Sequence, residues 1–203
     1  MKRDEDVRSY VVLGIDITRY SDKSLGEQKW AQEVVDRLLH DAINGSPASA
    51  ASRPEWLDGG DGGYAVFTWS ERQVIDLLDD FSEMLERENT RSNNDHRVSV
   101  RVALHVGQLI RWTGKLGLKF TGHTLNDCAR LLAGMKRDQI GQVVCSGAFF
   151  DAISTYGTTA KTTRLLDTVD KHSHSHRTYN LCRDPGLGVD PPEEDLFPDP
   201  FER

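Results

Sequence analysis

The sequence predicts an α+β domain in which an antiparallel sheet is covered by helices on one face. Two observations lead to this fold class. Apolar, β-branched runs of strand length alternate with stretches whose apolar residues recur at helical spacing. The first six elements follow in the order β-α-β-β-α-β, which is typical of an antiparallel sheet packed against helices, and further elements come after them. The 203 residues, 37% of them hydrophobic, suffice for one such domain with a core.

The first strand and the first helix are predicted at residues 9–17 and 24–43. The strand, SYVVLGIDI, is an almost continuous apolar run that carries a carboxylate, Asp16, near its end. The helix has a clear apolar stripe, which predicts a buried face. The stripe consists of Trp30, Ala31, Val34, Val35, Leu38, Leu39, Ala42 and Ile43. The small, polar and proline-punctuated segment 44–54 then predicts a flexible loop.

A β-hairpin and a second helix come next. Two short strand-like runs flank the segment DGGDGG at 58–63, which predicts a hairpin whose turn carries Asp61. Ser70 and Gln73 have the spacing of a capping box, so a helix is expected to begin after Ser70.

The second half of the chain predicts a strand at 97–107, followed by shorter elements. Residues 108–121 match neither a clean strand nor a clean helix. Thr124 is expected to cap a short helix. A strand, a short helix and a last strand are predicted at 142–146, 147–154 and 177–182.

Composition excludes several classes of protein. The net charge of −7 argues against a nucleic-acid partner, because that would need clustered Lys and Arg. No apolar run approaches ~18 residues, and the start MKRDEDVR is typical of neither a signal nor a transit peptide, so no membrane partner is expected. Three widely spaced cysteines predict reduced thiols in a cytoplasmic protein. We expect one domain over 1–182 and an acidic tail over 183–203, disordered or lying along the surface, with five of the seven prolines.

Two carboxylates are the first candidates for chemistry. Asp16 lies near the end of a strand, and Asp61 lies in a glycine-rich turn. Acids in such places can be approached closely, as divalent metal binding at phosphates requires. Each alone also fits an ordinary role, as a turn cap or a hairpin residue. Their joint placement favours a metal site.

Five segments resemble, in order, motifs of the class III adenylate and guanylate cyclase catalytic domain. They are VLGIDITRYSD (12–22), GGDGGYAVF (59–67), VRVALHVGQLIRW (100–112), FTGHTLNDCARLLAG (120–134) and GQVVCSGAFFDAI (141–153). The motifs correspond to the strand with the first metal aspartate, the hairpin with the second, the strand leading into a dimerisation arm, the helix with the transition-state Asn and Arg, and the strand and helix that follow. The resemblance implies a ferredoxin-like βαββαβ core of the class III cyclase type with extra strands.

The resemblance implies a site for two metal ions and a triphosphate. Asp16 and Asp61, with the carbonyl of Ile17, would hold two Mg²⁺ or Mn²⁺ ions, one lowering the pKa of the ribose 3′-hydroxyl and one binding the triphosphate. Backbone amides of a short loop would cradle the terminal phosphates. These amides belong to Thr18, Arg19, Tyr20 and Ser21. Arg101 matches the phosphate-binding arginine of the family, and Lys171 matches its phosphate lysine less closely.

Two further residues are implied to act on the reacting groups. Asn126 would orient the ribose, and Arg130, four residues later on the same helix face, would neutralise charge on the α-phosphate. In this family the metal aspartates and the Asn/Arg pair meet across a subunit boundary. A single copy of the domain therefore implies a head-to-tail homodimer with composite sites, whose arm would be the segment 108–121.

The chain departs from the purine cyclases where they read the base. Leu57 and Lys119 replace the lysine and aspartate with which adenylate cyclases recognise adenine. An ammonium group only donates hydrogen bonds, so Lys119 suits a base carbonyl, which uracil, cytosine and guanine possess. Trp56 and Leu57 are expected to narrow the pocket for a smaller base. The pattern is closer to the pyrimidine cyclases of bacterial Pycsar anti-phage systems and favours UTP, then CTP, with GTP still open. Lys119 as a solvated arm residue is equally open.

Other functions stay open at this point. The product would be a cyclic nucleotide such as cUMP, a second messenger for an effector protein that does not contact the enzyme. A purine cyclase, a diguanylate cyclase (because DGGDGGYAVF is similar to the GGDEF hairpin), a catalytically dead nucleotide-binding domain and a ferredoxin-like interaction module are the alternatives. The histidine-rich run KHSHSHR at 171–177 is interpreted as exposed polar sequence.

Overall fold

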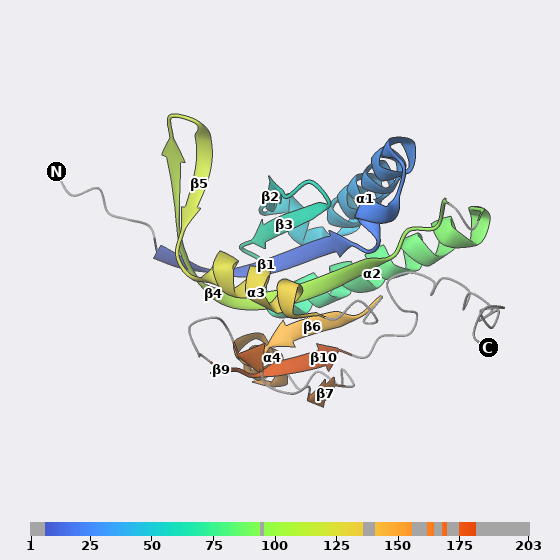
Figure 1. Cartoon of the computed structure of the whole chain (residues 1–203). Coiled ribbons are helices and arrows are strands. Elements are labelled where there is room, and N and C mark those ends of the chain that lie inside the picture. The colour runs from blue at the N-terminus through green and yellow to red at the C-terminus, as the bar shows by residue number, and fades with distance from the viewer. Residues whose placement is uncertain are drawn as a thin grey trace.

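A computed structural model describes residues 7–93, 96–135, 141–155, 162–164, 168–169 and 175–181 (Figure 1). The predicted tail over 183–203 lies outside these residues. The elements are β1 (Val7–Ile17), η1 (Tyr20–Asp22), α1 (Leu25–Gly45), η2 (Pro47–Ala50), β2 (Glu55–Asp58), β3 (Gly62–Phe67), α2 (Glu71–Arg91), β4 (Val100–Gly114), β5 (Gly117–Thr121), α3 (Thr124–Gly134), β6 (Val143–Ser146), α4 (Gly147–Thr155), β7 (Thr162–Arg164), β8 (Thr168–Val169), β9 (Ser175–His176) and β10 (Thr178–Leu181).

The main sheet has the strand order β2-β3-β1-β4-β6-β10-β7, with β5 paired to β4. Its first four strands are antiparallel to one another and alternate with α1 and α2 along the chain as a ferredoxin-like βαββαβ unit requires. The predicted α+β fold class is confirmed. One detail differs from a purely antiparallel sheet, because β6 pairs with β4 in parallel.

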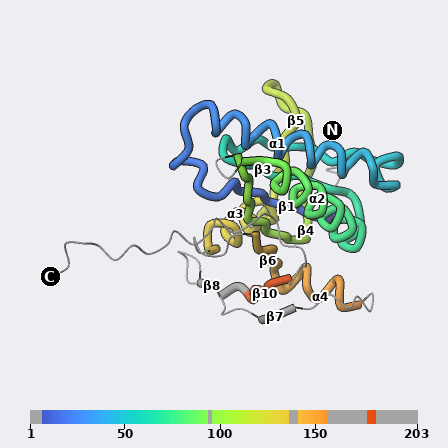
Figure 2. Tube along the Cα trace, turned by 90° about the vertical axis from the view of Figure 1, so that its right-hand side faces the viewer, coloured from blue at the N-terminus to red at the C-terminus, as the bar shows by residue number. Residues whose placement is uncertain are grey.

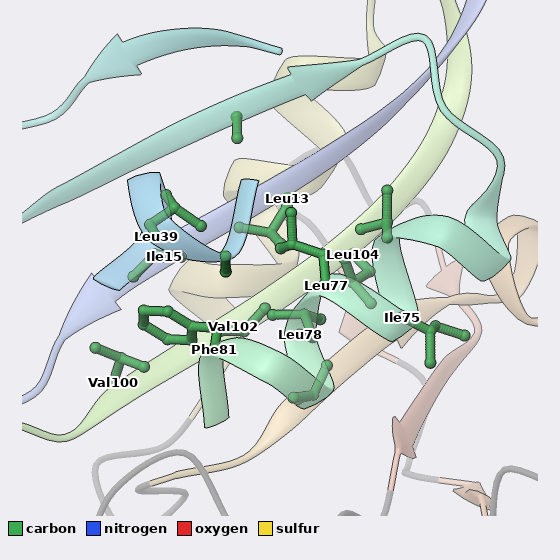
Figure 3. Packing of buried hydrophobic residues seen from close by; sticks show 14 of the residues in the cluster. Leu13, Ile15, Leu39, Ile75, Leu77, Leu78, Phe81, Val100, Val102 and Leu104 are labelled. Atoms are coloured by element: carbon green, nitrogen blue, oxygen red, sulfur yellow. The ribbon is translucent and has the colours of Figure 1, made fainter. Parts of the chain in front are cut away.

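Helices cover both faces of the sheet, whereas the sequence predicted one covered face. The core on one face joins α1, α2 and α4 to alternate residues of β1 and β4 (Figure 3). On the other face α3 lays Cys128, Leu131 and Leu132 against the residues in between, such as Val12 and Ala103. Figure 2 shows α3 on one side of the sheet and α2 and α4 on the other. Both faces of the central strands are therefore buried, which explains why β1 is an almost continuous apolar run.

Local signals placed the starts of the long helices. The Gln73 amide donates to Ser70 Oγ at 3.4 Å and the Ser70 amide donates to Gln73 Oε1 at 2.9 Å, as the capping box predicted. Thr124 does not cap α3, contrary to the prediction. It lies inside the helix, and its hydroxyl donates to the Gln108 carbonyl of β4 at 2.9 Å. The helix thus begins one residue earlier than predicted, with His123 at the N-cap position, and the Thr124 hydroxyl joins α3 to β4.

The ambiguous segment 108–121 is a β-hairpin. β4 continues past the sheet to Gly114 and returns as β5, so the hairpin projects from the body of the domain (Figure 1). Leu109 and Phe120 at its base pack against the core, but its outer part has no second layer within the described residues: Trp112 is 46% exposed and Leu116 is 89% exposed. Without one buried face, selection imposes no apolar alternation, which is why the sequence pattern was unclear. Across the described ranges, we find no helix with both the length and the apolar character that spanning a bilayer demands.

Candidate active site

The two aspartates meet where β1 ends beside the β2–β3 turn. Asp16 lies opposite Gly62 in the β1–β3 pair, and the Ile17 amide donates to the Asp61 carbonyl at 2.8 Å. A Cβ on Gly62 would lie 2.0 Å from the Ile15 carbonyl oxygen, so only glycine allows this approach of the turn to β1. Both aspartates line one pocket of about 370 Å³. The structure thus brings together the two carboxylates that the sequence singled out.

The loop after β1 forms the floor of the same pocket. Arg19 has a left-handed backbone (φ 55°) and the short helix η1 follows it, a combination that points successive amides toward one place. Within the described residues, no acceptor contacts the amides of Arg19, Tyr20 and Ser21. The Thr18 amide instead donates to the Ser99 carbonyl at 2.9 Å. The predicted anion-binding loop therefore offers three amides and not the amide of Thr18.

Arg101 lies opposite Asp16 on β4 and binds it directly. Its Nε donates to Asp16 Oδ2 at 2.9 Å, and a second guanidinium nitrogen donates to the same oxygen. Its Nη1 donates to the Met135 carbonyl at 3.0 Å. The Arg101 and Asp16 side chains are 20% and 18% exposed. A cation of the protein itself thus balances Asp16, and a divalent ion at Oδ2 of this carboxylate would compete with the guanidinium.

Tyr64 is a further pocket residue that the sequence analysis missed. With both aspartates, Arg101 and Ala129 of α3 it lines an adjoining pocket of about 210 Å³. Burial, followed by the charges of Cys128, Asp16 and Asp61, raises the pKa of the Tyr64 hydroxyl. The phenol therefore stays protonated and can donate a hydrogen bond. The signal was present in the chain: Gly14, which pairs with Tyr64, leaves room for its ring.

Asn126 and Arg130 lie on α3, the helix whose Ala129 borders the smaller aspartate pocket. Asn126 is exposed, and the Arg130 side chain is 35% exposed, with Nη1 donating to Asp127 Oδ1 at 2.9 Å. Neither residue lines a pocket that contains Asp16 or Asp61. One chain therefore does not bring this pair together with the metal aspartates.

The predicted base-reading residues do not share a pocket within one chain. Trp56 and Leu57 are neighbours in β2, so their side chains lie on opposite faces of the sheet. Trp56 lines a pocket of about 500 Å³ on the α1 side, and Leu57 packs on the α3 side. Lys119 lies on the projecting hairpin, opposite Trp112. Lys171 lies outside the described residues, as do His172 and His174 of the histidine-rich run.

The donor set at Asp16 and Asp61 fits Mg²⁺ or Mn²⁺ bound together with a phosphate. The described residues hold no group of three or more His, Cys, Asp or Glu side chains that could enclose an ion. Ile17 also borders the pocket, and because its side chain is buried in the core it can offer only backbone, including its carbonyl. Mg²⁺ is commonly held by one or two carboxylates, with substrate phosphates and water completing its coordination. These residues meet that requirement, with Arg101 as a competitor for Oδ2 of Asp16.

The domain is similar in structure to solved adenylate and guanylate cyclase domains. An adenylate/guanylate cyclase/hydrolase from Silicibacter pomeroyi superposes with a TM-score of 0.68 at 18% identity, covering 88% of this chain and 99% of that one. The guanylate cyclase domain of RhGC from Catenaria anguillulae, solved in complex with GTP, has a TM-score of 0.66 at 19% identity and covers 86% and 96%. A bacterial light-regulated adenylyl cyclase has a TM-score of 0.68 at 16% identity, covering 88% of this chain and 53% of that chain.

These likenesses establish the fold, which is that of cyclase catalytic domains. The sequence matches no protein-family model. Nor does it match any curated protein at a significant level. What the chain does must therefore be argued from its own site.

Proposed function

We propose that this protein is a nucleotidyl cyclase, which converts a nucleoside triphosphate to a 3′,5′-cyclic nucleotide and pyrophosphate. The observation that carries the proposal is one pocket that combines Asp16, Asp61, Arg101 and three loop amides for which the described residues offer no acceptor. Carboxylates for metal ions beside cationic and amide groups for phosphates are what a bound metal–triphosphate needs. The shared fold supports the same activity.

Each residue has a role in the reaction. Asp16, Asp61 and the Ile17 carbonyl would hold two Mg²⁺ or Mn²⁺ ions, which supply charge for acidifying the ribose 3′-hydroxyl and for neutralising the triphosphate. The 3′-oxygen loses its proton and attacks the α-phosphorus, while the bond from that phosphorus to the pyrophosphate oxygen breaks. The amides of Arg19, Tyr20 and Ser21 bind the terminal phosphates, as would Lys171.

The remaining reaction groups come from a second subunit. Asn126 orients the ribose and Arg130 neutralises the charge that grows on the α-phosphate. Neither residue is among those that line the two described aspartate pockets of one chain, which supports a head-to-tail homodimer. The projecting β4–β5 hairpin, with Trp112 46% exposed, offers the arm that such a dimer needs.

The first experiment measures cyclisation directly. Purified protein is incubated with each of the four labelled NTPs and Mn²⁺, and the products are identified. Asp16→Ala and Asp61→Ala should abolish the cyclic product while the far-UV CD spectrum stays normal. Asp80→Ala, an exposed aspartate of α2, is the matched control and should keep full activity. Turnover retained by either site variant would exclude the two-metal mechanism, and a di-nucleotide product would favour the diguanylate cyclase alternative.

Subunit mixing tests the composite site. Asp61→Ala and Arg130→Ala are each inactive, but a mixed dimer has one interface with all its residues. An equimolar mixture should recover about a quarter of wild-type activity, because half of the dimers are mixed and each has one intact site. No recovery, with subunit exchange shown by a labelled partner, would mean that each chain carries a full site.

For the substrate we favour UTP ahead of CTP, with a purine triphosphate as the alternative. In this proposal Lys119 donates to a base carbonyl, and Leu57, which lies on the same face of the sheet as the aspartates, limits the size of the base. Trp56 lies on the opposite face and no longer has a role in base selection. The residues Leu57 and Lys119, whose pattern resembles that of the Pycsar pyrimidine cyclases, are the basis for proposing a cytoplasmic anti-phage messenger, read by a separate effector. Lys119→Asp should then erode UTP use and admit CTP or ATP, because an acceptor now faces the base. The kcat/KM values for the four NTPs decide: ATP or GTP as clearly best would refute the pyrimidine assignment and leave the cyclase assignment intact.

A further inference from the structure

A chain of polar side chains runs from the sheet to Arg130 on the α3 face. Arg130 Nη1 lies 2.9 Å from Asp127 Oδ1, and the other oxygen of Asp127 lies 3.9 Å from His105 Nε2. His105 Nδ1 lies 2.8 Å from the Ser146 hydroxyl. The chain joins side chains of three different elements, α3, β4 and β6. The cyclase assignment uses Arg130 and leaves the other three residues without a role.

We propose that Asp127 is a positioning residue, which holds the Arg130 guanidinium in the orientation needed for catalysis, and that His105 and Ser146 hold Asp127 in turn. The inference rests on the proposed function and adds a determinant of its rate. Asp127 touches no reacting atom in this scheme. It acts through Arg130 alone.

The burial of the chain makes it more than a surface ion pair. Asp127 is 24% exposed and His105 is 14% exposed, so both lie mostly out of water, where charge interactions are less screened. A free arginine side chain samples many rotamers, and a guanidinium that must meet a phosphate of the other subunit gains from being fixed beforehand. Asp127 lies one helical turn before Arg130, the spacing at which side chains of a helix meet.

Ser146 determines how His105 faces Asp127. The Ser146 hydroxyl oxygen accepts the Phe149 amide at 3.2 Å, which leaves the hydroxyl hydrogen free to donate to His105 Nδ1. A neutral imidazole that accepts at Nδ1 carries its proton on Nε2, the nitrogen nearest to Asp127. A hydrogen bond in this direction, at the N-terminus of α4, would favour the tautomer that supports the carboxylate. Ser146, where β6 meets α4, is in this way connected to Arg130 through His105 and Asp127.

The test compares Asp127→Asn with a matched control. Asp127→Asn keeps the size of the side chain and removes the charge, and it should lower kcat about 10–100-fold with little change in KM. Asp151→Asn is the matched control and should leave kcat unchanged. Asp151 lies on the helix α4 and also binds an arginine, with 2.7 Å between its Oδ2 and Arg177 Nη2. Ser146→Ala should lower kcat by a smaller factor. An unchanged kcat in Asp127→Asn would overturn the proposal.

Two further readouts separate positioning from a general structural effect. In an Arg130→Ala background, Asp127→Asn should cause no additional loss, since its effect passes through Arg130; an equal loss in both backgrounds would refute this. In mixed dimers, Asp127→Asn should complement Asp61→Ala and fail to complement Arg130→Ala.

An experiment without turnover keeps the two proposals distinct. The side-chain NMR signal of the Arg130 guanidinium should be narrow and ordered in the wild type and broadened in Asp127→Asn. A wild type that makes no cyclic product from any NTP refutes the proposed function. An Arg130 guanidinium that is equally mobile in both proteins refutes the positioning role, whatever the cyclase activity of the wild type.

Discussion

Replacing Arg101 with methionine tests whether this arginine occupies the place of a metal ion at Asp16. The change keeps most of the length of the side chain and removes both hydrogen bonds to the carboxylate and the one to the Met135 carbonyl. Asp16 then remains as a charge about four-fifths buried, beside a second carboxylate, Asp61. In metal-free buffer the folded state should therefore lose stability.

The size of the loss follows from the burial of the pair. Breaking a fully buried ion pair costs about 3–5 kcal/mol, and each hydrogen bond to a charged group contributes about 1.5–3 kcal/mol. Because about a fifth of each side chain reaches water, solvent replaces part of the interaction. We expect Arg101→Met to lower the free energy of unfolding by about 2–4 kcal/mol in EDTA.

Mn²⁺ should reverse most of this loss. In the variant the ion binds a carboxylate without a competing guanidinium, whereas in the wild type it competes with Arg101 for Asp16 Oδ2. An ion at 100 times its Kd stabilises by about 2.7 kcal/mol, so added Mn²⁺ should raise the stability of the variant by more than that of the wild type. The readouts are urea unfolding followed by CD, with EDTA or Mn²⁺, and Mn²⁺ binding by EPR.

Arg111→Met is the matched control. Arg111 pairs with Glu55 at 2.6 Å, but the two side chains are 49% and 39% exposed, so the change should cost at most about 1 kcal/mol and leave the response to Mn²⁺ as in the wild type. Equal Mn²⁺ stabilisation of wild type and Arg101→Met would refute the competition argument. An unchanged free energy of unfolding of Arg101→Met in EDTA would refute the loss expected from the burial of the ion pair.

Three further perturbations test the architecture around the site. Gly62→Ala forces a methyl against the Ile15 carbonyl, so it should lower the free energy of unfolding by about 1–3 kcal/mol and abolish the cyclase activity. Urea midpoints and turnover measure both effects, and an active, stable variant would show that the turn can shift. Asn89→Leu leaves the buried N–H and C=O of Val98 without the partners that now lie 2.8 and 2.7 Å away, so urea unfolding should show a loss of about 2–5 kcal/mol, and a loss below 1 kcal/mol would contradict the accounting. Burial raises the pKa of the Cys128 thiol from 9.0 to about 12, so the unfolded chain releases this proton at lower pH than the folded one. The stability should be unaffected by this thiol below pH 9 and should fall by up to about 1.4 kcal/mol per pH unit between pH 9 and 12, a part of the slope that Cys128→Ala should remove.

The sequence by itself determined the features that depend on short-range signals. The β1 run, the stripe of α1 and the capping box at Ser70 each follow from the backbone and from neighbours within a few residues. The Asp61 turn follows from the glycines around it, which permit a close approach that other residues would block. The α+β class and the pair of carboxylates could therefore be predicted without the structure.

Only the tertiary structure decided how distant segments use these residues. The Thr18 amide is taken by Ser99, which lies 81 residues away, and the Thr124 hydroxyl is taken by a carbonyl of β4. Sequence spacing could place Trp56 and Leu57 side by side but could not say which face of the sheet holds the aspartates. The pairing of Arg101 with Asp16 depends on the register of two strands 85 residues apart. Hydrogen-bond partners and sheet faces are set by strand pairing across the fold, and a local pattern carries no record of that pairing.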